Sequence, residues 1–227
     1  MTSRFPSDAP TTLASLGGKA YALSELTGAG FPVPEYFVIT PSFFRADSIT
    51  RQSVRDYPFS EADRAQIQSA LERTGGDLFA VRSSAIDEDG RQASFAGQLD
   101  SFLEVPAAEV PDRIKAVWAS IFSARIAAYR AENQLQSEPA LPAVLVQRMV
   151  RAETAGVAFS ADVISGRWSV ALVNAVPGLG EKLVSGEADA DSWRIDQAGK
   201  ILEHTFANGQ AAETLQAAIK ETEAEQK

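Results

Sequence analysis

The short apolar run "LFAV", residues 78–81, constrains the fold most, because it ends at Arg82 and leads into a long polar loop. Consecutive apolar residues favour a strand that is buried on both faces, whereas a half-exposed strand alternates apolar and polar residues. Such a strand belongs inside a sheet that other elements cover. In α/β proteins, ligands gather outside the carboxyl ends of strands. Arg82 is therefore the first candidate for a binding residue.

Helical and strand patterns alternate through the first half of the chain, which predicts an α/β (α+β) fold. In residues 17–30, Ala20, Leu23 and Leu26 repeat at helical spacing before two glycines. Ser60 is suited to the start of a second helix, residues 60–73. The pattern also predicts strands at 35–40, 78–83 and 98–105, and a long helix at 111–133.

The second half changes to strand patterns, with tight turns at 161–167 and 196–200. The expected strands cover residues 143–150, 155–161, 167–176 and 191–196, and a final helix is expected near 208–220. We therefore predict two lobes, a first lobe at 1–140 and a partial second lobe at 141–227.

Composition narrows the class of protein. The chain has 227 residues, no cysteine and one histidine, which argues against disulfides and a histidine-based zinc site. A net charge of −9 argues against broad nucleic-acid binding, although positive charge can still be concentrated in a cleft. No apolar run is long enough for a membrane span, and the N-terminus lacks a signal-peptide pattern. These features predict a soluble, cytoplasmic protein.

Two short motifs fail when their spacing is checked. The segment "GGKA", residues 17–20, is no P-loop, because Leu13 stands where glycine is needed and Ala20 where Ser or Thr is needed. It can still bind an anion through backbone N–H groups and Lys19, but the segment alone favours glycines that open a helix and a solvated lysine. The acids at 87–89 do not continue into a calcium-loop pattern.

Arg82 has two interpretations that its neighbours leave open. Its planar guanidinium matches phosphate, and the turn around Gly97 can approach phosphates closely because glycine has no Cβ. Alternatively, Arg82 pairs with the acidic loop that follows it in the sequence.

Four blocks, in order, resemble the N-terminal AMP/ATP-binding domain of the pyruvate phosphate dikinase, phosphoenolpyruvate synthase and rifampicin phosphotransferase family. They are "LGGKAYALSELTGAGFPVPEYFVIT", "FAVRSSAIDEDGRQASFAGQLDSFLEV", "VLVQRMVRAETAGVAFSAD" and "PGLGEKLVSGEADADSWRID". Together they span residues 16–196, which is nearly the whole chain.

The resemblance implies an ATP-grasp fold, in which two α/β lobes hold ATP. It implies a kinase reaction that phosphorylates a histidine on a separate domain, with Arg82 and Lys19 as catalytic residues at the ATP phosphates. The other implied nucleotide contacts are Gly97, Ser101, Gln147, Met149 and Glu181. Gln147 and Met149 would lie where the backbone meets adenine.

The chain also departs from the family pattern. The family's "DIEW" segment and "Q.R" strand, which hold magnesium, have no counterpart here, so the usual Mg²⁺ ligands are absent and no metal-binding residue is assigned. His204 lies outside any phosphohistidine motif. We expect a truncated, split or degenerate module that needs a partner chain or domain and is inactive as an isolated chain. The alternatives are a non-catalytic nucleotide-binding or regulatory module, and a remnant that binds nothing.

Overall fold

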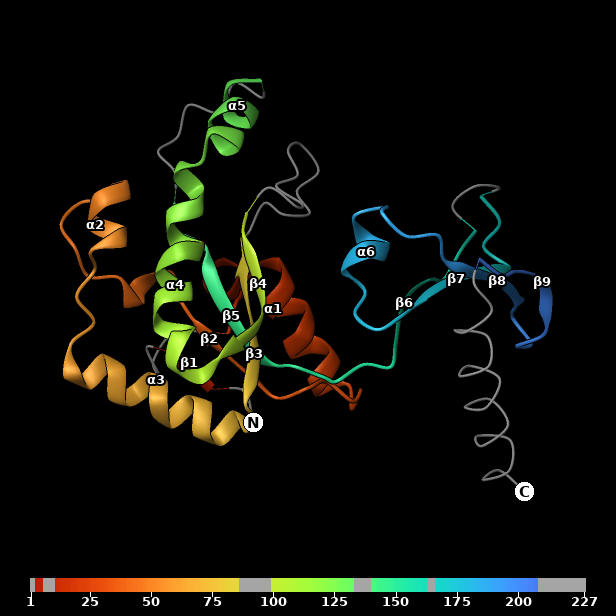
Figure 1. Cartoon of the computed structure of the whole chain (residues 1–227), viewed down its shortest axis with the longest axis horizontal. Coiled ribbons are helices and arrows are strands. Elements are labelled where there is room, and N and C mark those ends of the chain that lie inside the picture. The colour runs from red at the N-terminus through yellow and green to blue at the C-terminus, as the bar shows by residue number, and fades with distance from the viewer. Residues whose placement is uncertain (1–2, 6–10, 86–98, 133–139, 163–165, 208–227) are drawn as a thin grey trace. The chain divides into compact units, whose positions relative to one another are not determined.

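The computed structural model describes residues 3–5, 11–85, 99–132, 140–162 and 166–207. The chain is a mixed α/β protein, as predicted, and it divides into two compact units (Figure 1). The first unit comprises residues 1–149 and the second comprises residues 150–227. Each unit contains its own sheet.

The first unit is built on a five-stranded sheet in the order β1-β2-β5-β3-β4. Its strands are β1 (Ser3–Phe5), β2 (Tyr36–Ile39), β5 (Ala143–Arg148), β3 (Leu78–Ser84) and β4 (Ser101–Pro106). Only the β1–β2 pair is parallel; the other described pairs are antiparallel. The predicted strand at "LFAV" is confirmed, and it lies between β5 and β4.

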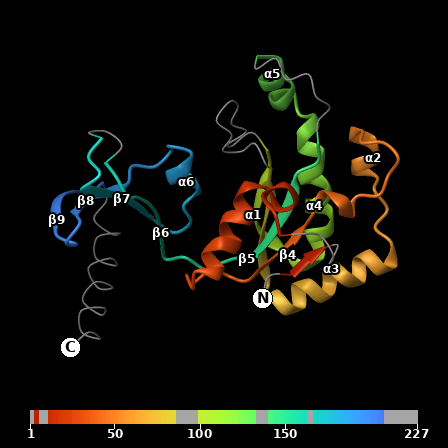
Figure 2. The same cartoon turned by 180° about the vertical axis from the view of Figure 1, so that it is seen from behind.

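Helices cover both faces of this sheet (Figures 1 and 2). Side chains of α1 (Leu13–Gly28) pack with Val38 and Leu145 on one face. Side chains of α4 (Val110–Ala119) pack with Phe37, Val81 and Val144 on the other. Because successive strand residues point to opposite faces, the apolar runs supply both cores at once. The helices α2 (Arg51–Arg55) and α3 (Glu61–Thr74) join the α4 side.

The predicted single helix at 111–133 is wrong, because it consists of α4, a 3-10 turn at Ser120–Phe122, and α5 (Ala124–Glu132). Two serines explain the break. The hydroxyl of Ser120 donates to the Val117 carbonyl, and the Oγ of Ser123 accepts from the Ile126 N–H. Serine side chains compete with backbone hydrogen bonds in this way and favour helix ends over helix interiors.

The strand at 143–148 belongs to the first unit, whereas the predicted second lobe begins at residue 141. β5 pairs with both β2 and β3, and its residues 143–146 are buried. A buried strand needs hydrogen-bonding neighbours on both sides, and the first sheet supplies them. The division between the units therefore follows Met149.

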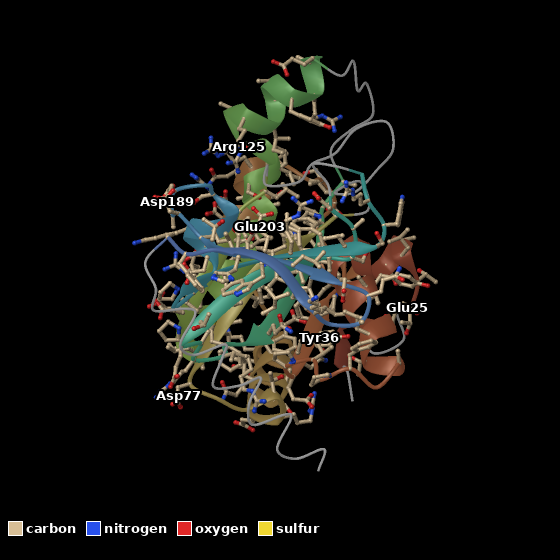
Figure 3. All side chains as sticks on the ribbon, turned by 90° about the vertical axis from the view of Figure 1, so that its right-hand side faces the viewer. Glu25, Tyr36, Asp77, Arg125, Asp189 and Glu203 are labelled. Carbon is tan, nitrogen blue, oxygen red and sulfur yellow. The ribbon has the colours of Figure 1, made fainter. Side chains whose placement is uncertain are left out.

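The second unit contains an antiparallel sheet in the order β6-β7-β8-β9. Its elements are β6 (Thr154–Phe159), β7 (Val170–Pro177), α6 (Glu181–Val184), β8 (Asp191–Asp196) and β9 (Ile201–Thr205). No strand was predicted from the sequence at the position of β9. Figure 3 labels Glu203 on this exposed strand. The predicted helix at 208–220 lies outside the described residues.

Within the described ranges, no helix is long and apolar enough to cross a membrane.

Candidate functional site

The "GGKA" segment is attached to the end of β3. The N–H of Gly18 donates to the Ala85 carbonyl at 2.9 Å, and the N–H of Ala20 donates to the Ser84 hydroxyl at 3.0 Å. The Lys19 ammonium donates to the Ser83 carbonyl at 3.3 Å. Three successive residues of α1 thus contact three successive residues of the β3 end, although 64 residues separate Lys19 from Ser83 in the chain. Lys19 is held beside the strand that carries Arg82.

Gly17 makes this close contact possible. It has a φ of +71° and interrupts the helix, which begins earlier, at Leu13, with Thr12 as its N-cap. A Cβ at Gly17 would lie 1.9 Å from the Ser84 carbonyl oxygen. Gly17 separates a short first turn, which begins at Leu13, from the longer helical segment that follows, so the glycines stand where that segment opens. Gly17 also allows the backbone to meet the strand, which only a residue without a Cβ can do here.

Arg82 lies within β3, two residues before the strand ends at Ser84, and not at its last position. Its cross-strand partners are Ser101 on β4 and Leu145 on β5. Directly paired residues share a face of the sheet. Since Leu145 packs against α1, Arg82 and Ser101 lie on the α1 face too. Lys19, Arg82 and Ser101 therefore gather on one face of one unit.

Arg82 is a partly buried residue, and its guanidinium has no ion pair or hydrogen bond to the described part of the chain. A partly desolvated arginine without a carboxylate partner can receive an anion, because its planar fork of donors fits phosphate. The alternative, a pair with the acids at 87–89, falls outside the described residues, and so does Gly97.

Gln147 shares the α1 face as well, since it stands opposite Tyr36 and Ala80 and two residues from Leu145. Its side-chain amide donates to the Pro34 carbonyl at 3.2 Å. The N–H of Met149 donates to the Leu78 carbonyl at 3.0 Å. The backbone N–H of Met149 is therefore already bonded, which leaves its carbonyl and its thioether for other contacts.

Tyr36 is a residue that sequence reasoning missed. Its side chain is 4% exposed, and its hydroxyl has no hydrogen-bond partner within the described residues. A buried hydroxyl without a partner is costly, which suggests a role in binding. No signal in the sequence marks it, because an aromatic residue at the start of a strand looks like an ordinary core residue. Figure 3 labels Tyr36.

Glu181, the last predicted contact, belongs to the second unit. It is the first residue of the short helix α6, and its side chain is exposed. Across the described residues, no three acidic or histidine side chains lie close enough to hold a metal ion.

The comparisons with known proteins identify the class. Residues 43–226 match the family model described as "Pyruvate phosphate dikinase, AMP/ATP-binding domain". The chain belongs to this family of AMP/ATP-binding domains, as its sequence blocks had indicated.

Three curated relatives show the range of proteins that carry such a domain. The chain is 38% identical over 206 residues to the prodigiosin synthesizing transferase PigC of Serratia marcescens, covering 83% of this chain and 23% of the relative. It is 36% identical to a probable phosphoenolpyruvate synthase of Methanothermobacter thermautotrophicus, covering 83% and 33%. It is 32% identical to the rifampicin phosphotransferase of Bacillus subtilis, covering 89% and 27%. The chain thus spans between about a quarter and a third of these relatives.

Proposed function

We propose that this chain binds ATP and acts as the nucleotide-binding part of a dikinase-type phosphotransferase. The family and the relatives named as a synthase and a phosphotransferase support the class of reaction. The attachment of Lys19 to the end of β3, on the face that carries Arg82, supports the binding site. In this proposal the two units are the lobes of an ATP-grasp fold.

The proposed phosphate site would act mainly through electrostatic attraction between its cations and the phosphates of ATP. ATP would supply the phosphoryl group, for a histidine on a separate domain. Lys19 and Arg82 would offset the negative charge of the polyphosphate and fix its orientation, and Ser101 would donate its hydroxyl. The half-buried position of Arg82 strengthens its attraction for an anion relative to that of a fully solvated arginine.

The adenine end would be bound on the same face of the sheet. Gln147 and Met149 would provide polar and apolar contacts to the base, with the buried Tyr36 opposite Gln147 in the sheet, while Lys19 and Arg82 hold the phosphates. Magnesium keeps several waters and is held largely through substrate phosphates. Among the described residues, no group of three acidic or histidine side chains is close enough to add protein ligands to that magnesium ion.

Calorimetric titration of the chain with ATP, GTP and adenosine tests the proposal. We expect saturable ATP binding that is tighter than adenosine binding, because the phosphate contacts add to the base contacts. GTP should bind more weakly if Gln147 and Met149 meet adenine. The absence of both heat and thermal shift with millimolar ATP would reject nucleotide binding by this chain.

A further inference from the structure

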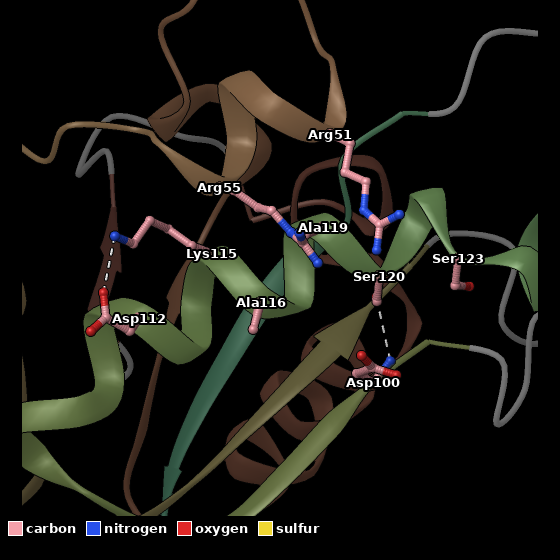
Figure 4. A pocket seen from close by; sticks show the side chains of 9 residues that line it. All are labelled: Arg51, Arg55, Asp100, Asp112, Lys115, Ala116, Ala119, Ser120 and Ser123. Carbon is pink, nitrogen blue, oxygen red and sulfur yellow. Dashed lines mark hydrogen bonds and ion pairs between the residues drawn. The ribbon is translucent and has the colours of Figure 1, made fainter.

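A polar pocket lies on the α4 side of the first unit, between α2 and α4 (Figure 4). It has a volume of about 350 Å³, which is within the range of small-ligand sites. Arg51 and Arg55 line it from α2, and Lys115 lines it from α4. Figure 4 shows both guanidinium groups reaching from α2 towards Ala119 and Ser120.

The positive charge of this pocket is not neutralised by its acids. Asp112 pairs with Lys115 at 2.9 Å, and Asp100 pairs with Arg125 at 3.5 Å. Arg51 and Arg55 have no carboxylate partner among the described residues. The pocket is therefore lined by three cations and two carboxylates, and both carboxylates are paired with cations other than Arg51 and Arg55.

The spacing of the two arginines adds to this imbalance. Arg51 and Arg55 are four residues apart on one short helix, where like charges repel each other. Both side chains are nevertheless directed into the same cavity, in a protein whose net charge is −9. An anion between them would turn the repulsion into two charge-assisted contacts.

The two serines that line the pocket differ in whether their hydroxyl proton is available to a ligand. The hydroxyl of Ser120 already donates to the Val117 carbonyl at 2.7 Å. The oxygen of Ser123 accepts from the Ile126 N–H at 3.3 Å, which leaves its hydroxyl proton to donate to a ligand. Two guanidinium groups from α2 and the hydroxyl of Ser123, from the turn between α4 and α5, thus line the same pocket.

This pocket is separate from the proposed nucleotide site. α2 and α4 pack on one face of the first sheet, whereas Lys19, Arg82 and Ser101 lie on the face covered by α1. The five-stranded sheet stands between the two sets of cations.

We propose that Arg51, Arg55 and Ser123 form a second anion site, which binds a phosphomonoester. A tetrahedral dianion accepts donors from several directions, as the two arginines and the serine offer them, whereas one planar carboxylate is satisfied by a single arginine fork. The cavity exceeds the volume of a bare phosphate group, so it has room for a small organic substituent.

Two-dimensional ¹H–¹⁵N NMR of the whole chain tests the site, with sodium phosphate, glycerol 3-phosphate and malonate as probes and sodium chloride at matched ionic strength as the reference. We expect saturable shifts at the signals of Ser120 and Ser123. Arg55→Gln and Arg51→Gln should each weaken binding about tenfold, since each removes a charge-assisted contact. Arg73→Gln, an equal charge change at an exposed position of α3, should leave it unchanged.

Each outcome decides the proposal. Tighter binding of glycerol 3-phosphate than of phosphate supports an organic phosphomonoester, and equal binding overturns that assignment, because the organic group then contributes nothing. Malonate that binds as tightly as either one overturns the assignment to phosphate. Shifts that do not saturate, or that Arg51→Gln and Arg55→Gln leave unchanged, overturn the site itself. Repeating the titration with Arg82→Ala should give the same affinity, because that residue lies on the other face.

Discussion

At the scale of single residues, Arg82 combines partial burial with the absence of a partner in the described part of the chain. We expect Arg82→Ala to weaken ATP binding about 10- to 100-fold, because a lost charge-assisted contact is worth about 1.5–3 kcal/mol. Adenosine binding should hardly change, since adenosine carries no phosphate. Calorimetry with both ligands measures the difference, with Arg73→Ala on α3 as the control. An equal loss for both ligands, or a large fall in Tm without ligand, would mean a structural role.

Gly17 gives a second prediction at this scale. Gly17→Ala should destabilise the protein by more than about 3 kcal/mol, because strain at positive φ adds to a steric collision. The collision is with the Ser84 carbonyl oxygen, 1.9 Å from the new Cβ. Gly28→Ala is the matched control, because no atom lies within 4 Å of its Cβ and its φ is not positive. Urea unfolding of both variants measures the effect; similar midpoints would contradict the packing of "GGKA" on β3.

The sequence identified Lys19 and Arg82 as candidates, but it could not show that Lys19 contacts the strand that carries Arg82. Their motifs carry the resemblance to the family, so both were predicted. The hydrogen bonds that join Lys19 to Ser83, and Ala20 to Ser84, span 64 residues. Spacing within one motif carries no information on a contact of that range. Tyr36 was missed for a related reason, because a buried hydroxyl without a partner exists only in the folded protein.

At the scale of elements, the capping residue Ser60 located the start of α3, whereas continuous helical periodicity gave no sign of the break between α4 and α5. Ser60 caps α3 and forms a capping box with Asp63, as its residue type had suggested. The break after Ala119 depends on Ser120, whose hydroxyl also accepts from the Asp100 N–H at 3.4 Å. That second contact comes from a distant segment, so helical periodicity continued across the break in the sequence.

The cap of α3 can be tested directly. Ser60→Ala should lower the free energy of unfolding by about 1 kcal/mol, since it removes the acceptor for an N–H of the first turn. That N–H belongs to Asp63, at 3.1 Å from the Ser60 Oγ. The matched control is Ser69→Ala on the same helix, an exposed position where alanine favours the helical state and only a surface hydrogen bond from Arg73 is lost. Denaturation midpoints compare them, and an equal loss for both variants would show that the cap contributes nothing.

At the scale of the whole molecule, the four blocks identified the family because they are spread along nearly the entire chain. The first lobe was predicted to end at residue 140, whereas the first compact unit ends at Met149, and the sequence of β5 does not indicate which sheet the strand joins. Its place was decided by pairing with β2 and β3. The net charge did not reveal the pocket between α2 and α4 either, since a chain with a charge of −9 contains a pocket lined by two arginines that have no carboxylate partner in the described part of the chain.

The last prediction concerns phosphoryl transfer by this chain alone. Its one histidine, His204, lies on the exposed strand β9, with its ring centroid 4.6 Å from that of Phe206. A self-phosphorylation through the family's chemistry would have to use this residue. No metal-binding group of acids is present in the described part of the chain to assist it. We therefore expect neither stable labelling of the protein nor AMP release above background on incubation with β- and γ-labelled ATP and magnesium.

Alkali-stable labelling and product chromatography measure this result, and His204→Ala and Arg82→Ala separate its possible causes. Label that appears on the wild type and disappears in His204→Ala would show that the chain phosphorylates its own histidine. AMP release that Arg82→Ala abolishes would show turnover at the proposed nucleotide site without a second domain. Either result would contradict a purely nucleotide-binding role. ATP binding without label or AMP would support a domain that holds the nucleotide for an acceptor elsewhere, because the phosphate contacts would then be present without a group to receive the phosphoryl.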